Sequence, residues 1–367
     1  MSNDLQGTER YRLWPVDRRM LTAIPTIGLS VGFVLAALAY AGGALSPERL
    51  TQTSMIKAFE EVNSVNTGFR RNHAKGVCVS GRFDSNGNGV GLSKAAVFKR
   101  GAVPVIGRFA VAVGRPFVPD NETEVRSMAL SFRPPGAEEW RTGMNDIPVF
   151  SVKDAKGFYD QLLASQVDST TGKPDPEKMK AFFVAHPESQ RALQLIQAKP
   201  FSTGFGNASY NSLDAFRFVN AEGVSTAVRW SMVAIEPFAP EIPAQATASD
   251  KNYLFDALIA RIEHGPLQWR LVVTVGGPGD PTNDATIPWP EDRQQVDVGT
   301  LTIDHIEAEG PNNCRDVNFD PLVLPPGIEP SDDPLLSARS AVYSTSFTRR
   351  AREPKTPSEV QIPGKGG

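Results

Sequence analysis

Residues 68–83 read GFRRNHAKGVCVSGRF, and the two halves of this stretch differ in character. The second half alternates apolar residues with small or polar ones, which is typical of a β-strand with one buried face. The first half places His73 among three cations, Arg70, Arg71 and Lys75. Because nearby positive charge disfavours a protonated imidazole, we expect a neutral histidine ahead of a strand and arginines that await an anion.

The rest of the chain supplies further β-rich runs separated by glycine, proline and asparagine. These runs read AAVFKRGAVPVIGRFAVAV, EVRSMALSF, IPVFSV, FRFVNAEGVSTAVRWSMV, LQWRLVVTV and VGTLTIDHI. Helical patterns cover residues 47–65, 154–165 and 176–196, the last one capped by Asp175. Antiparallel runs with helices inserted at one side predict an α+β domain built on a barrel or closed sheet.

The first fifty residues form a separate segment. Residues 20–47 carry no charge and are long enough to cross a bilayer as one helix. Arginines at positions 10, 12, 18 and 19 precede this run, which predicts an N-terminus inside and an exported C-terminal domain. We expect residues 1–19 to be cytoplasmic and residues 20–46 to be a single-pass anchor in the inner or cytoplasmic membrane. A cleaved secretory signal is the alternative.

The composition excludes some partners and sites. The net charge is −3, so there is no strong positive field and nucleic acid is not an expected partner. Only two cysteines occur, Cys78 and Cys314, without a CxxC pair that would indicate zinc or an iron–sulfur cluster. They could pair in an oxidising compartment, but two buried free thiols are the favoured reading. The folded domain is expected over residues 47–353, with a disordered polar tail over residues 354–367.

Residues 331–350, SDDPLLSARSAVYSTSFTRR, predict one more helix. Asp333 can cap it, and the following proline suits its first turn. Arg339 and Tyr343 are four residues apart and therefore neighbours on one face, and Arg350 lies two turns further along. A helix face with these three side chains is expected to contact an anion or a metal, or else to face water.

Taken together, these segments resemble the haem catalase family, and most closely the small catalase-related peroxidases. FRRNHAKGVCVSGRF resembles the segment with the distal histidine, PVIGRFAV a strand with a propionate-binding arginine, and WRTGMNDIPVFSVKD the segment with the distal asparagine. FRFVNAEG resembles a strand pair of the family, and GIEPSDDPLLSARSAVYSTSFTRR the helix with the axial tyrosine. The resemblance covers residues 46–350 and implies a catalase-like antiparallel β-barrel with surrounding helices.

The resemblance implies a role for particular residues. His73 and Asn145 correspond to the catalytic distal pair, and Tyr343 corresponds to the axial iron ligand with Arg339 as its partner. A tyrosine ligand must ionise, and a guanidinium one helical turn away favours the phenolate.

The remaining implied contacts are with the edge and faces of the cofactor, expected to be haem b (iron protoporphyrin IX). The positions that correspond to propionate-binding arginines are Arg70, Arg108 and Arg350. Phe158 corresponds to a phenylalanine that packs near the haem.

The chain also departs from the large catalases. Ala110 stands where many of them carry a serine that supports the histidine, and Asn72 stands where they usually have valine. The shorter chain predicts a more open haem and a monomer or small homo-oligomer. We therefore expect a peroxidase that uses hydrogen peroxide or organic peroxides and a small organic donor, with weak or no catalase activity. The alternatives are an enzyme that rearranges lipid hydroperoxides, a non-catalytic haem carrier, and a membrane-attached module without cofactor.

Overall fold

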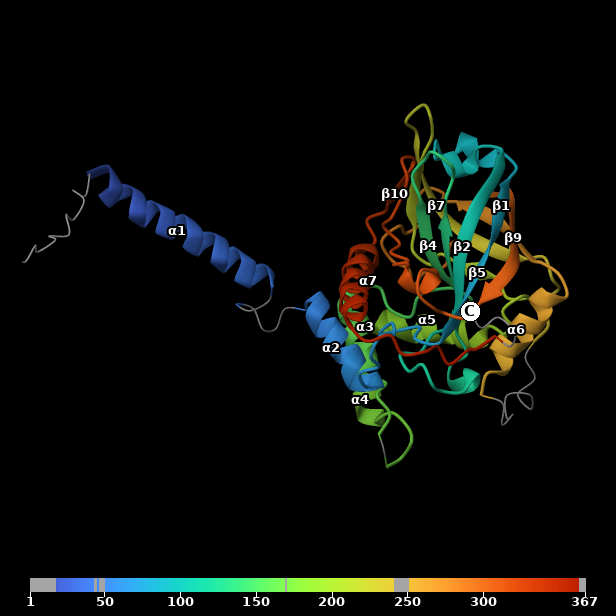
Figure 1. Ribbon diagram of the computed structural model, residues 1–367, viewed down its shortest axis with the longest axis horizontal. Coiled ribbons are helices and arrows are strands. Elements are labelled where there is room, and N and C mark those ends of the chain that lie inside the picture. The colour runs from blue at the N-terminus through green and yellow to red at the C-terminus, as the bar shows by residue number, and fades with distance from the viewer. Residues whose placement is uncertain (1–17, 43–44, 46–49, 169, 241–250, 363–367) are drawn as a thin grey trace, which may run out of the picture. The chain divides into compact units, whose positions relative to one another are not determined.

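The computed structural model describes residues 18–42, 45, 50–168, 170–240 and 251–362 of the chain (Figure 1). The chain divides into two compact units, Met1–Thr51 and Gln52–Gly367. The described part of the first unit is mainly one helix. The second unit is a β-barrel with helices around it.

Helix α1 (Arg18–Ala41) makes up most of what is described of the first unit. Its segment Ala23–Ala41 has a mean hydropathy of 1.9, and none of it is buried. By length and composition this helix can cross a membrane, and a signal sequence would pass the same test. Insertion into a membrane therefore stays a prediction. The predicted start of the next helix at Ser46 and Pro47 lies outside the described residues.

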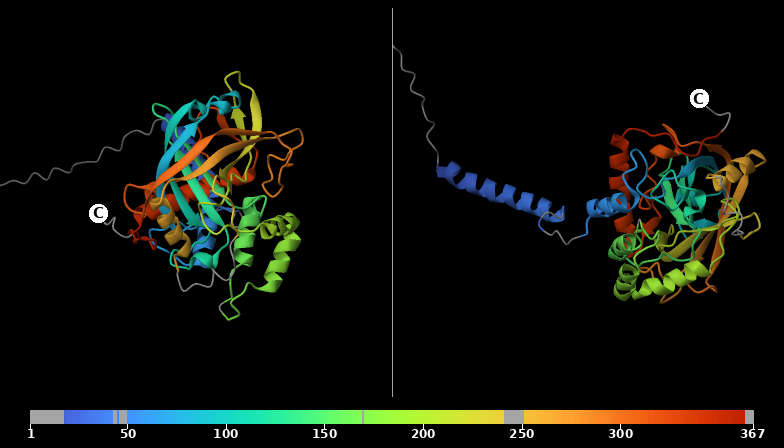
Figure 2. Two further views of the ribbon diagram at one scale, coloured as in Figure 1. Left: turned by 90° about the vertical axis from the view of Figure 1, so that its right-hand side faces the viewer. Right: turned by 90° about the horizontal axis from the view of Figure 1, so that it is seen from below.

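The strands of the second unit form one antiparallel sheet. They are β1 (Gly76–Ser85), β2 (Gly101–Val111), β3 (Arg126–Phe132), β4 (Trp140–Asn145), β5 (Tyr210–Asn211), β6 (Phe216–Val219), β7 (Ser225–Ala234), β8 (Leu267–Val275), β9 (Gln295–Glu307) and β10 (Ile328–Pro330). Eight of them follow one another as β7-β5-β4-β3-β2-β1-β9-β8, and β8 pairs back with β7 to close a barrel (Figures 1 and 2). The short strands β6 and β10 continue the sheet beside β7. The predicted α+β fold on a closed antiparallel sheet is confirmed.

The barrel interior is filled by large apolar side chains. Trp140 packs against Phe132 with ring centroids 4.8 Å apart and against Trp230 at 5.1 Å. These rings belong to one buried cluster that also takes alternate residues of β1, β2, β3 and β4. Because successive side chains of a strand point to opposite faces, the residues between them face outward. A small barrel filled in this way has no room for a cofactor, so a binding site must lie on its outer face.

The helices of the second unit are α2 (Gln52–Asn63), α3 (Ala155–Ala164), α4 (Pro176–Ala185), α5 (Pro187–Ala198), α6 (Tyr253–Glu263) and α7 (Pro334–Arg352). Helices α2, α3, α4 and α7 gather on one side of the barrel (Figure 1). The predicted caps are confirmed: Asp175 accepts from the backbone N–H of Glu177, and Asp333 from that of Leu335.

The predicted helix over residues 176–196 is interrupted. His186 lies between α4 and α5, because the proline at position 187 starts a new helix and cannot continue the old one. This histidine is buried, and its Nε2 lies 2.9 Å from a carboxylate oxygen of Asp160 in α3. The break between the two helices therefore leaves the imidazole buried and not in solvent.

The predicted disordered tail is also wrong for residues 354–362. Val360 and Ile362 are buried and belong to the barrel cluster. The Thr356 hydroxyl donates to the Thr67 carbonyl at 3.1 Å, and the Thr356 carbonyl accepts from Arg315 at 2.6 Å. Two isolated apolar residues in a polar, proline-containing stretch give no periodic signal, so their burial could not be predicted. The last five residues of the chain lie outside the described residues.

Candidate active site on the outer face of the barrel

Strand register aligns one row of small and polar residues across three neighbouring strands. Ala110 of β2 pairs with Ser127 of β3, and Ser127 pairs with Asn145 of β4. Opposite residues of antiparallel strands point to the same face of the sheet. Because Phe109, Met128 and Met144 fill the interior, this row faces outward.

A second row lies two residues along the same strands. It runs from Cys78 of β1 through Arg108 and Ala129 to Gly143 of β4. The two rows together form a surface of small side chains with Arg108 and Asn145 at opposite corners. Apart from Arg108 at one corner, this surface has no large side chain, so it can accept a flat ligand or the tips of residues from other elements.

His73 reaches this surface from the loop that leads into β1. Its φ of 53° is in the left-handed region, which few residues other than glycine adopt and which functional sites often contain. The Nδ1 atom lies 3.0 Å from the Ser127 hydroxyl, and that hydroxyl donates to Oδ1 of Asn145. The two residues predicted to form the distal pair are thus joined through a single serine.

The imidazole of His73 is held in its neutral form. Burial, followed by the positive charges of Arg108, Arg339 and Arg70, lowers the pKa of His73 to about 3. The side chain is nevertheless partly exposed, as are Asn145 and Arg339. The imidazole is therefore largely desolvated but still partly accessible. The influence of Arg339 shows that helix α7 brings its guanidinium within electrostatic range of the imidazole.

Tyr343 and Arg339 lie together on the face of α7 that looks toward this surface. The Arg339 guanidinium is 6.0 Å from the Tyr343 ring centre. A Cβ on Gly143 would lie 3.7 Å from the Tyr343 hydroxyl, so the phenol oxygen sits over β4 two residues before Asn145. Arg339 also donates to the Gly143 carbonyl at 3.4 Å and forms a buried ion pair with Asp214. Although burial opposes its charge, attraction to Asp214 and then to Tyr343 raises the pKa of Arg339.

The three arginines predicted to bind propionates converge at one edge of the site. Arg70 and Arg108 both donate to the carboxylate of Glu309, at 2.8 and 2.9 Å to the same oxygen. Arg70 and Arg350 both donate to the Val317 carbonyl, at 3.0 and 3.2 Å. Burial, with repulsion from Arg350 and Arg108, lowers the pKa of Arg70, and burial is also the main cause that lowers the pKa of Arg350 to about 10.

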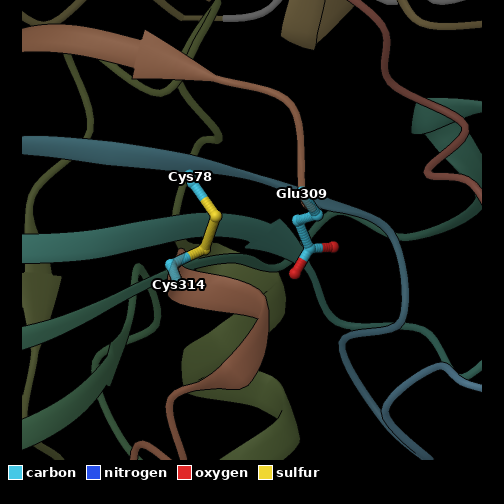
Figure 3. Close-up of side chains that lie close together, drawn as sticks. All are labelled: Cys78, Glu309 and Cys314. Carbon is cyan, nitrogen blue, oxygen red and sulfur yellow. A yellow bond between two sulfur atoms is a disulfide. The ribbon is translucent and has the colours of Figure 1, made fainter. Parts of the chain in front are cut away.

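A disulfide joins Cys78 to Cys314 close to Glu309, the carboxylate that Arg70 and Arg108 bind (Figure 3). Cys78 faces outward from β1 and meets Cys314 of a short 3₁₀ turn, with the Cα atoms 5.4 Å apart. The favoured expectation of two free thiols is therefore wrong, because sequence spacing cannot show that residues so far apart meet. Glu309 lies close to both sulfur atoms, but the disulfide leaves no thiolate for a metal.

The other cations of the opening stretch have structural partners. Arg71 is buried and bonds Glu60 of α2 at 2.9 Å and Glu353 just beyond α7. Lys75 is fully buried in an ion pair with Asp120 at 2.6 Å. These pairs fix the loop that carries His73 on both sides. Only one of the three cations beside the histidine therefore faces the site.

Phe158 has a different environment from the other predicted site residues. Its ring contacts Phe59 of α2 and Phe150, with ring centres 5.7 and 6.0 Å apart. It is partly exposed. Its contact with a haem stays a prediction.

Sequence reasoning missed three residues of the site: Ser127, Glu309 and Asp214. Ser127 could have been noticed as an outward-facing polar residue in the alternating run EVRSMALSF. Glu309 and Asp214 follow strands in irregular segments, where no periodicity indicates which way a side chain points. Their roles depend on contacts with residues more than a hundred positions away.

Comparisons with known proteins identify the family of this chain. The family model described as catalase matches residues 39–362. A catalase-related peroxidase of Synechococcus elongatus is 36% identical over 335 residues, which cover 91% of this chain and 97% of the relative. A catalase-related peroxidase of Mycolicibacterium paratuberculosis is 32% identical and is covered over 95% of its length, against 82% of this chain.

Solved structures show the same fold. A bacterial catalase superposes with a TM-score of 0.68 at 22% identity, over 86% of this chain and 64% of that one. Catalase A of Saccharomyces cerevisiae superposes with a TM-score of 0.69 at 20% identity, over 82% of this chain and 65% of its own. The match to the family model and to relatives over nearly their whole length shows that the chain belongs to the catalase family.

Proposed function

We propose that this chain is a haem-dependent peroxidase that reduces hydrogen peroxide or organic peroxides at the expense of a small organic donor. The observation that carries the proposal is the arrangement on the outer face of the barrel. His73, held neutral and bonded through Ser127 to Asn145, lies on the same surface over which the Tyr343 hydroxyl sits with its arginine. A base and an amide donor that face an oxygen ligand are what peroxide cleavage at a haem requires.

Catalase family membership implies a haem, and we assign haem b to this site. The donor set fits: Tyr343 offers a phenol oxygen, and the positive guanidinium of Arg339 lies 6.0 Å from its ring centre. Asp214 forms an ion pair with the same guanidinium and so holds it in place. An anionic oxygen ligand stabilises oxidised iron.

The charges at the edge of the site also fit the cofactor. Arg70, Arg108 and Arg350 supply three guanidinium groups, and Glu309 is the carboxylate that bonds two of them. Two positive charges are therefore left over, and they match the two propionates of haem b. Charge-assisted hydrogen bonds from guanidinium to carboxylate are among the strongest in proteins.

The protein's own groups can then move the proton. Neutral His73 can accept a proton from one peroxide oxygen and return it to the other as the bond between them breaks. Oδ1 of Asn145 accepts from Ser127, and within the described residues no hydrogen bond is made by its Nδ2, which can therefore donate to a peroxide oxygen. Bound haem supplies the iron at which peroxide is cleaved and the oxidising equivalents that the donor later removes.

Several observations favour a peroxidase over a rapid catalase. Both catalase-related peroxidases described above match this chain over nearly their entire length. The residue before His73 is Asn72, which is polar and partly exposed. Ala110 has no hydroxyl, so the hydrogen bond with His73 is made by Ser127 on the neighbouring strand. We therefore assign weak or no catalase activity to this chain.

An absorption spectrum and two peroxide assays test the proposal. The full chain, purified and supplied with haem, should show a Soret band, oxidise a phenolic donor when peroxide is added, and release little oxygen without donor. Absence of haem binding, or rapid oxygen release with no donor oxidation, would overturn it. A fatty-acid hydroperoxide that is isomerised without donor consumption would indicate the lipid-rearranging alternative. The variant His73→Ala should keep the Soret band and lose peroxide reactivity.

The proposal includes a location. Helix α1 anchors the chain in the inner or cytoplasmic membrane, and the haem domain lies on the extracytoplasmic side. The apolar length of Ala23–Ala41 and the arginines that precede it support this orientation. The Cys78–Cys314 disulfide suits an oxidising compartment. Membrane fractionation with protease digestion of spheroplasts tests it, and recovery as a cytosolic protein with both thiols free would contradict it.

A further inference from the structure

We propose that Ser127 is the positioning residue of the site: it fixes the ring proton of His73 on Nδ1 and aligns His73 with Asn145. This inference rests on the proposed function, because it concerns the same distal pair. Ser127 contacts neither iron ligand nor propionate arginine in the described residues, so its role is exerted through the other two side chains.

The direction of the two hydrogen bonds follows from their atoms. The Ser127 hydroxyl carries one hydrogen, and Oδ1 of Asn145 can only accept. The hydroxyl hydrogen therefore points to Asn145, and the serine oxygen is left to accept from Nδ1–H of His73. Since a neutral imidazole carries one proton, Nε2 of His73 then has a free lone pair. That nitrogen is the proton acceptor which peroxide cleavage needs.

The same bonds determine the orientation of the amide. With Oδ1 held by Ser127, the Nδ2 group of Asn145 points away from the serine and can donate to a peroxide oxygen. If the amide were reversed, it would donate to Ser127, and the hydroxyl would then donate to Nδ1 of His73. The proton of His73 would move to Nε2, and the base would be lost. The Ser127 hydroxyl thus couples the orientation of the Asn145 amide to the tautomer of the His73 ring.

No other group in the described part of the chain hydrogen-bonds the His73 ring. Burial is the main cause that lowers the pKa of His73 to about 3, so the ring carries a single proton. Its backbone is in the left-handed region, which does not by itself select a tautomer. Ser127 is therefore the single contact that can distinguish the two ring nitrogens.

The register explains how the hydroxyl reaches the ring from this strand. Ala110 and Ser127 are directly opposite in the β2–β3 pair, and such residues have Cβ atoms about 5 Å apart. Both side chains face outward beneath His73. A hydroxyl on either residue could reach Nδ1, and in this chain only the β3 residue carries one. Ala110 itself is buried and leaves no polar group on β2 at this level.

The experiment compares three variants as haem-loaded full-length proteins: Ser127→Ala, Ser127→Thr, and Ser127→Ala combined with Ala110→Ser. In Ser127→Ala we expect the rate constant for reaction with peroxide to fall about 10- to 100-fold, the usual range for removing a group that orients a ligand or base. Cyanide affinity should fall in parallel, since bound hydrogen cyanide passes its proton to the distal base. Ser127→Thr and the double variant should recover most of both losses.

Ser131→Ala is the matched control. Ser131 lies on the same strand and the same face, is also buried, and bonds Glu139 and Arg133 instead of the distal pair. Its loss should leave peroxide reaction and cyanide affinity unchanged. Equal losses in both variants, or no rescue by the double variant, would show a general structural effect and overturn the proposal.

A measurement without haem separates this proposal from the proposed function. The chain contains only four histidines, so ¹⁵N-histidine labelling can resolve the tautomer of His73 by NMR in the haem-free full chain. We expect the Nδ1–H tautomer in the wild type and a mixture in Ser127→Ala. An Nε2–H tautomer, or one tautomer unchanged by the substitution, would overturn the positioning role, whatever the protein does with haem.

Discussion

Breaking the Cys78–Cys314 disulfide should destabilise the second unit strongly. The two cysteines are 236 positions apart in the sequence. In the chain-entropy account, cross-linking a loop of that length removes unfolded-state entropy worth about 5 kcal/mol at 25 °C. The chain has no other cysteine, so any effect of a reducing agent on stability acts through this bond.

Urea unfolding with and without dithiothreitol measures the effect. Trp140 and Trp230 lie in the barrel interior and report its opening by fluorescence. For a slope of about 3 kcal/mol per molar urea, a loss of about 5 kcal/mol lowers the midpoint by between about 1 and 2 M. The variant with both cysteines replaced by serine should match the reduced protein and should not respond to dithiothreitol.

The same perturbation should loosen the arginine cluster. The Cys314 carbonyl accepts from Arg70 at 3.0 Å, and the nearby Val317 carbonyl accepts from both Arg70 and Arg350. When the turn is no longer tied to β1, we expect haem to transfer faster to an acceptor protein. Equal urea midpoints for protein with the bond intact and reduced, each confirmed by mass spectrometry, would refute the reasoning.

Four further predictions concern the site itself. Gly76→Ala puts a Cβ 2.4 Å from the Arg108 guanidinium, so haem should transfer faster to an acceptor protein, and an unchanged rate would argue against Arg108 as a propionate ligand. Because the pKa of His73 is about 3, its imidazole stays neutral on acidification, and the rate of reaction with peroxide should hold from about pH 7 to about pH 4.5; a decline centred near about pH 6.5 would contradict this. Tyr343→Phe should abolish or grossly alter the ferric spectrum, whereas a normal spectrum would exclude Tyr343 as the ligand. Glu309→Gln leaves buried guanidinium groups uncompensated and should cost about 3 kcal/mol in the haem-free protein, measured by urea unfolding, and less with haem bound; equal losses would show that no propionate replaces the lost charge.

The barrel and the last helix could be predicted because their signals are local. Alternation at period two indicated the strands, and an aspartate followed by proline at positions 333–334 marked the start of α7. The resemblance then assigned roles to residues of both elements. The structure brings His73 and Asn145 together through one serine and places the Arg339 guanidinium 6.0 Å from the Tyr343 ring centre.

What could not be predicted depends on register and on long-range pairing. Ala110 stands where many catalases carry the serine that supports the histidine. The sequence of one strand does not show which residue of the next strand lies opposite, so the hydroxyl of Ser127 on β3 could not be predicted. The meeting of Cys78 with Cys314, and of Arg70 with Glu309, needs the closed barrel to bring β1 and the end of β9 together. Such contacts depend on the topology of the barrel, and they cannot be predicted from a single sequence whose fold is unknown.

The division of the barrel into two faces explains why stability and chemistry can vary separately in this fold. The interior face holds the aromatic cluster around Trp140, which responds to lost volume with lost stability. The outer face holds the two rows in which a Cβ on Gly143 would already contact the Tyr343 hydroxyl and the Arg339 guanidinium at ordinary distance. Any larger side chain there would enter the space of these groups. The small residues of the outer rows therefore leave room for Tyr343 and Arg339, and moving a hydroxyl from one strand to its neighbour would change the support of His73 without altering the core.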